Sequence, residues 1–207
     1  NEDWFNEAER KGALCFSYEN YQQKIENIVL KCHFKIDLSE GFQGWETSLK
    51  NIQELMPLNK IIINDAYLLD KPEFYESNVY PLIKAISKNK KTTKLFYTDI
   101  LNKKLTFNIG LIYNLLKEKY PTSEIKIMHN NVDNLNSHDR LLYSNHYIID
   151  CAIGFNFNQQ LTSNSQIIIE TIFEKYTYNR LRNHLRKMDN HFQNLLTDKR
   201  MNAYYPN

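Results

Sequence analysis

The sequence contains little glycine and little proline, and this scarcity bears directly on phosphate chemistry. Only five of the 207 residues are glycine and five are proline. The glycines are scattered and form neither a GxGxxG nor a GxxxxGK pattern, the loops whose backbone N–H groups surround a nucleotide phosphate. Nucleotide hydrolysis on a P-loop is therefore excluded, and we expect no cofactor.

Cysteine is equally scarce. Cys15, Cys32 and Cys151 are odd in number, far apart, and set among apolar or alternating residues. No CxxC, HxxxH or HExxH spacing occurs, so we predict no metal site. Cysteines of this kind are typical of reduced core residues, which favours a cytoplasmic location.

Long hydrophobic runs are also missing. No stretch of about 18 apolar residues is present, and the first ten residues are acidic, so we expect neither a membrane span nor a signal peptide. Hydrophobic residues nevertheless make up 42% of the chain and aromatic residues 13%. This composition can supply the core of one domain without disulfides.

The net charge is only +2, but the positive charge is unevenly distributed. Residues 84–104 hold seven lysines against one acid, and residues 175–200 hold seven basic residues against two acids. Either segment could be an ordinary solvated helix surface or part of an anion-binding face. The basic residues that we select as binding candidates are Lys90, Lys91, Lys94, Arg182 and Arg186.

Strand and helix patterns alternate along the first two thirds of the chain. Apolar residues alternate with polar ones over 28–38, while the run at 60–69 is almost continuously apolar, as in a central strand covered on both faces. We predict strands at 28–38, 60–69, 93–98 and 124–129, and helices at 45–56, 73–88 and around 109–116. This order predicts an α/β fold with a mostly parallel sheet flanked by helices.

The pattern changes after an asparagine-rich loop at 130–137. Residues 140–144 and 147–153 indicate two short strands that form an antiparallel hairpin, and 166–173 indicates a further strand. A long terminal helix follows, whose apolar residues from Tyr178 to Leu195 recur in steps of three and four. That seam could pack on its own domain or on a second copy. We divide the chain into an N-terminal strand–helix portion (1–58), an α/β core (59–175) and a C-terminal helix and tail (176–207).

One constellation could carry chemistry. His138 and Arg140 are two residues apart at the start of the hairpin, so strand alternation places them on one face. An imidazole can act as nucleophile or acid/base, and a guanidinium binds phosphate oxygens. The pair suits a phosphodiester.

The spacing His138-x-Arg140-x-x-x-x-Asn145, with Gly154 after the second strand, resembles a modified HxKxxxxD…G motif of the phospholipase D superfamily. The strand at 61–67 and the following units are similar to the phospholipase D-like domains at the C-termini of MIT-domain proteins. The resemblance implies a sandwich that presents the motif on a hairpin, with His138 as nucleophile and Arg140 as phosphate ligand. Asn145 stands where the family has Asp, so the carboxylate at that position is lost.

Three functions remain open. The altered motif favours a non-catalytic, phosphate-binding module that recognises nucleic acid or an anionic membrane surface. The first alternative is a metal-independent phosphodiesterase or nuclease, which the family implies would need two His138 residues facing each other in a homodimer. The second is a protein-interaction scaffold. A homodimer is expected in any case, because both the single motif and the heptad-like seam are incomplete in a monomer.

Overall fold

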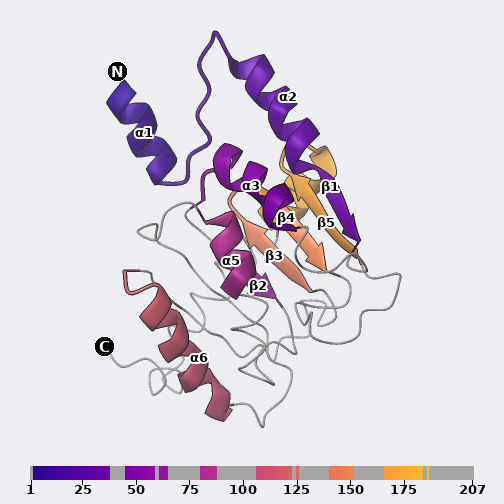
Figure 1. Ribbon diagram of the computed structural model, residues 1–207. Coiled ribbons are helices and arrows are strands. Elements are labelled where there is room, and N and C mark those ends of the chain that lie inside the picture. Colours follow the sequence, from indigo (N-terminus) through magenta and orange to yellow (C-terminus); the bar gives the residue numbers. More distant parts are fainter. Residues whose placement is uncertain are drawn as a thin grey trace.

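The computed structural model describes residues 2–37, 45–58, 61–64, 80–87, 106–122, 125, 140–151, 166–183 and 186. Within them the fold is α/β, with helices packed against a five-stranded sheet (Figure 1). The helices are α1 (Glu2–Arg10), α2 (Tyr21–Cys32), α3 (Trp45–Leu55), α5 (Tyr80–Ile86) and α6 (Thr106–Lys119). The strands are β1 (Phe34–Asp37), β2 (Ile61–Asn64), β3 (Leu141–Ser144), β4 (Tyr147–Cys151) and β5 (Gln166–Thr171).

The described sheet is antiparallel throughout, which corrects the mostly parallel sheet expected from the sequence. Its order is β1-β5-β4-β3-β2, and each of the four neighbouring pairs runs antiparallel. The continuous apolar run of β2 misled the prediction, because Ile61, Ile62 and Ile63 are all at least 98% buried. Burial on both faces produces such a run whatever the direction of the neighbouring strand. The strand predicted at 93–98 and nearly all of the one at 124–129 lie outside the described residues.

The strand predicted at 28–38 is wrong in its first half. Residues up to Cys32 belong to helix α2, and strand β1 begins only at Phe34. Ile28 and Cys32 are fully buried, whereas Leu30 is 79% exposed. Side chains four residues apart share one face of a helix, while a residue midway between them points away. The apparent alternation therefore combined one turn of helix with the start of a strand.

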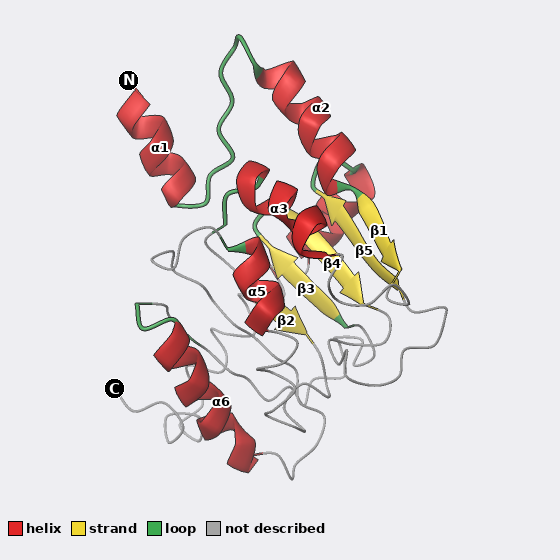
Figure 2. Cartoon of the chain, viewed as in Figure 1, coloured by secondary structure: helices red, strands yellow, loops and turns green. Residues whose placement is uncertain are grey.

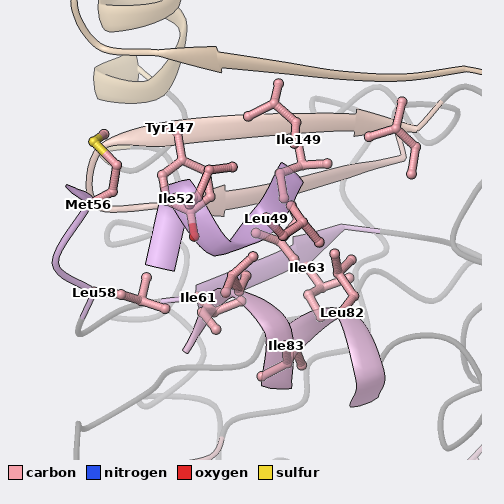
Figure 3. Close-up of a cluster of buried hydrophobic side chains, with 14 of the residues drawn as sticks. Leu49, Ile52, Met56, Leu58, Ile61, Ile63, Leu82, Ile83, Tyr147 and Ile149 are labelled. Atoms are coloured by element: carbon pink, nitrogen blue, oxygen red, sulfur yellow. The ribbon is translucent and has the colours of Figure 1, made fainter. Parts of the chain in front are cut away.

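The main core lies between one face of the sheet and the helices α2, α3 and α5. The predicted helix before Pro57 is confirmed as α3, and its side chains meet those of β2, β3 and β4 beneath them. Figure 3 shows part of this cluster. Its labelled members are Leu49, Ile52, Met56, Leu58, Ile61, Ile63, Leu82, Ile83, Tyr147 and Ile149. We call this side the front face of the sheet.

The predicted hairpin is confirmed by the pairing of β3 with β4, in which Leu142 lies opposite Ile149. The two strands are joined by Asn145 and His146, and no non-glycine residue in the described chain has a positive φ. The turn is closed by a side chain instead. The Ser144 hydroxyl accepts the N–H groups of His146 (3.1 Å) and Tyr147 (3.0 Å) and donates to the Tyr147 carbonyl (3.3 Å).

The opposite, or back, face of the sheet carries the C-terminal helix. Residues 175–183 are helical, as is 186, which confirms the start of the predicted terminal helix; residues beyond 186 lie outside the described chain. Thr177 donates to Glu170 at 3.0 Å, and Arg180 pairs with Asp150 at 3.5 Å. Glu170 and Asp150 alternate with the front-face residues of β5 and β4, so they point to the back. Among the described residues, no helix has the length and apolar character needed to span a membrane.

The N-terminal segment is tied to the sheet by polar contacts. Helix α1 is followed by a loop over 11–20 that leads into α2 (Figure 2). Lys24 on α2 binds Glu9 and the Cys15 carbonyl, both at 2.8 Å. His146, in the hairpin turn, bonds the Gly12 carbonyl through Nε2 at 2.7 Å. These contacts join residues 9–15 to two separate parts of the fold.

Candidate nucleic-acid interface

Arg140 stands immediately before β3 and extends its ladder. Its carbonyl accepts the Cys151 N–H at 3.0 Å, so the residue keeps the strand register. Alternation then places its half-buried side chain on the front face, the face of Leu142. His138 and Gly154, the other two positions of the predicted motif on either side of it, lie outside the described residues.

Asn145 is not brought together with Arg140. It occupies the hairpin turn, whereas Arg140 lies at the far end of β3, five residues away. At roughly 3.3 Å per residue this separation is about 16 Å. Asn145 is instead next to Ser144 and His146, in the turn closed by the Ser144 hydroxyl. The two described members of the motif thus occupy opposite ends of one strand.

The candidate basic residues likewise do not come together in one place. Lys90, Lys91 and Lys94 lie outside the described chain. Arg182 and Arg186 are both exposed on the C-terminal helix, four residues apart and therefore on one side of it. That helix covers the back face, so these arginines and the front-facing Arg140 cannot form one local site.

The structure adds Lys175 to the two arginines. Lys175, Asn179, Arg182 and Arg186 are all exposed and follow each other in steps of four, three and four residues. Helical geometry aligns such positions along one line, which here is the outer surface of the helix. We call these four residues the basic stripe. Within the part of the chain that is described, no ion pair engages Lys175, Arg182 or Arg186, whereas Arg180 is held by Asp150.

Two exposed tyrosines flank the basic stripe. Tyr176 is 70% exposed and Tyr178 is 44% exposed. The heptad-like seam placed Tyr178 with Leu181 on one packing face, but the buried positions of this turn are Thr177 (1% exposed) and Leu181 (3% exposed). Sequence reasoning therefore missed the tyrosines as surface groups. The signal that could have identified them is their interleaving with cations in Lys175-Tyr-Thr-Tyr-Asn-Arg180.

The described histidines serve the fold. The Thr171 N–H donates to His33 Nε2 at 3.1 Å, and the Thr171 hydroxyl contacts the same nitrogen, which joins the end of α2 to β5. Burial lowers the pKa of His146, so this imidazole is held neutral against Gly12. Burial also raises the pKa of the Cys32 thiol to about 12, which leaves it protonated and unreactive. In the described ranges no group of His, Cys, Asp and Glu is placed to hold a metal ion.

Comparison with known proteins finds structural similarity only. No protein-family model and no curated protein sequence matches the chain. Polyphosphate kinase from Porphyromonas gingivalis is similar with a TM-score of 0.43 and 8% identity, over 77% of this chain and 27% of that one. TrmBL2, described as an archaeal chromatin protein with a novel mode of DNA binding, has a TM-score of 0.38 and 9% identity, over 93% of this chain and 66% of that one. The chain thus spans about a quarter of the first protein's length. Similarity at this level does not indicate what the chain does.

Proposed function

We propose that this chain is a non-catalytic module that binds the phosphate backbone of nucleic acid through the basic stripe. The observation that carries the proposal is the alignment of Lys175, Arg182 and Arg186 on the outer surface of one helix, all exposed and without an ion pair among the described residues. Uncompensated cations in a row attract a polyanion and release its condensed counterions on binding. Arginine also presents a donor fork that matches phosphate oxygens.

The length of the stripe suits a nucleic-acid backbone. Eleven residues separate Lys175 from Arg186, which corresponds to about 16 Å at the helical rise. Phosphates follow one another at roughly 3.4 Å along the axis of one DNA strand, so the stripe spans about five of them. Three cations and the Asn179 amide can therefore contact one continuous stretch of backbone.

The packing of this helix favours nucleic acid over a membrane surface. An amphipathic helix binds a bilayer by inserting its apolar face among the lipids. Here the inner side of the helix, with Thr177 and Leu181, is buried against the chain itself. The outer side offers cations, amides and two tyrosines, but no aliphatic residue within the described part. Only electrostatic attraction would remain for an anionic membrane.

The phospholipase D-like resemblance remains part of the proposal. The resemblance implies a motif presented on a hairpin, and the β3–β4 hairpin with Arg140 at its base supports that part of it. The single motif and the loss of the carboxylate at Asn145 favour binding over catalysis. A phosphodiesterase would have to rely on His138, in a homodimer with two such residues.

The stripe can be tested by measuring binding as a function of salt. Fluorescence anisotropy would follow a labelled 20-nucleotide DNA, single-stranded and duplex, from 50 to 300 mM NaCl. We expect the variant K175Q/R182Q/R186Q to bind more weakly, with the slope of log K against log salt reduced by about 2 to 3, since each phosphate contact contributes about 0.7 to 0.9.

The matched control removes three exposed lysines from α2, α3 and α5, on the front side of the sheet, in the variant K31Q/K50Q/K84Q. It changes the net charge equally and should leave the slope almost unchanged. If the two variants lost DNA binding equally, only net charge would matter, and the assignment of binding to the basic stripe would be refuted. Cosedimentation with anionic liposomes, without binding to DNA, would select a membrane ligand. DNA cleavage that persists in EDTA and is lost in the H138A variant would show that the chain is a phosphodiesterase.

A further inference from the structure

The two flanks of the C-terminal helix face different parts of the sheet. Thr177 and Leu181 point inward, and Thr177 meets Glu170 on β5. Arg180 lies on one flank and reaches Asp150 on β4. At 100° per residue, Tyr178 lies on the opposite flank, some 160° around the helix from Arg180. The flank with Arg180 faces β4, so the flank with Tyr178 faces β5 and β1.

The back face of the sheet is open on that side. The apolar residues of β2, β3 and β4 on this face are buried: Ile62, Leu141, Tyr143 and Ile148 are each at most 2% exposed. Asp150 of β4, which lies across the ladder from Ile168, is only half-buried and is paired with Arg180. On β5, by contrast, Ile168 is 41% exposed. Its partner across the ladder is Lys35 of β1, which is also exposed. Directly paired residues in an antiparallel sheet share a face, so Lys35 and Ile168 form an accessible floor beside the helix.

Tyr178 lies between two cations of the basic stripe, whereas the cation that neighbours Tyr176 is already paired. Lys175 precedes Tyr178 by three residues and Arg182 follows it by four, the two spacings at which helix side chains are neighbours. The acidic groups nearby are Glu174, exposed one turn earlier, and Glu170, which is bonded to Thr177. At the same spacings Tyr176 is followed by Asn179 and by Arg180, whose charge is already paired with Asp150.

We infer that this flank binds single-stranded nucleic acid, with a base stacked on Tyr178 and the adjoining phosphates on Lys35, Lys175 and Arg182. The inference rests on the proposed function and specifies its ligand. A half-exposed ring between two cations provides the combination of stacking platform and positive groove that single strands use, and Ile168 offers apolar contact beside it. A duplex keeps its bases stacked inside the helix and can contact only the cations.

Four point variants of the full chain test this assignment, with the same labelled 20-nucleotide DNA as a single strand and as a duplex. We expect Tyr178→Ala to weaken single-strand binding about tenfold, the value for one stacked base, and to change duplex binding less than twofold. Tyr178→Phe keeps the ring and should retain nearly all of the affinity. Tyr176→Ala is the matched control, more exposed but on the other flank, and should have no effect. Lys35→Gln should weaken single-strand binding severalfold.

Three other outcomes have distinct meanings. Equal effects of Tyr178→Ala and Tyr176→Ala would overturn the assignment of the base to this flank. Duplex binding as tight as single-strand binding, with no effect of Tyr178→Ala, would overturn the single-strand ligand and leave the basic stripe standing. Absence of salt-dependent binding to either DNA would refute the proposed function and this inference with it.

Discussion

Removing the hydroxyl of Ser144 tests how the β3–β4 hairpin ends. The ladder between the strands stops at the pair Tyr143–Ile148, and the next N–H groups along the chain are bonded by the Ser144 side chain. Ser144→Ala leaves the Tyr147 N–H buried without that acceptor, since Tyr147 is fully buried, while the half-buried His146 can find water. A buried donor deprived of its partner costs about 1–3 kcal/mol.

We therefore expect Ser144→Ala to lower the free energy of unfolding by about 2 kcal/mol, mostly from one backbone group. For a chain of this size that corresponds to a fall in Tm of roughly 4–8 °C. Urea denaturation followed by circular dichroism measures the loss. Ser17→Ala is the control, because the Ser17 hydroxyl makes no hydrogen bond in the described structure, and it should change stability by less than about 0.5 kcal/mol. Equal losses for the two variants would refute the role assigned to the Ser144 hydroxyl.

Two further predictions concern stability. Because burial lowers the pKa of His146, the unfolded chain binds a proton there that the folded chain does not, and stability falls as the pH drops through about 6.5, by at most about 1.4 kcal/mol per pH unit. The difference in stability between the wild type and His146→Gln should therefore shrink from pH 8 to pH 5.5 in urea titrations, and a constant difference would contradict the buried, neutral imidazole. Ile28→Ala should cost about 2–5 kcal/mol, because this residue is fully buried, and Leu30→Ala less than about 0.5 kcal/mol. If the two variants lost similar amounts of stability, residues 28–32 would be part of a strand, as their sequence pattern suggests, and not of a helix.

That segment shows why local patterns can mislead. Ile28 and Cys32 satisfy both an even strand spacing and the i, i+4 spacing of a helix, and only the exposure of Leu30 separates the two. Strand direction was unpredictable for a different reason. Strand β1 pairs with β5, so that Phe34 lies opposite Ile169, more than 130 residues away. Nothing in the composition of either strand encodes so distant a partner.

Where the local residues determine the outcome, the sequence was sufficient. The hairpin follows from two short apolar runs around a polar pair, and α3 from apolar helical spacing that ends before Pro57. The candidate site was predicted in part. Arg182 and Arg186 lie on the predicted helix. The spacing of the apolar residues on that helix, in steps of three and four, does not show which of them are buried, because a buried stripe and an exposed stripe that run side by side produce the same steps. The exposure of Tyr178 therefore needed the packing of Thr177 and Leu181 against the sheet.

Crosslinking tests the proposed nucleic-acid interface most directly. Irradiation of the chain with a single-stranded DNA containing 5-iodouracil, followed by trypsin and mass spectrometry, identifies the aromatic residues next to the bases. Cleavage after Lys175 and Arg180 releases residues 176–180 as one peptide, which contains both tyrosines of the helix. We predict that this peptide carries the nucleotide, attached at Tyr178, and that 300 mM NaCl suppresses the crosslink. Crosslinks found only on other aromatic residues, with this peptide unmodified, would contradict the stacking of a base on Tyr178 beside the basic stripe.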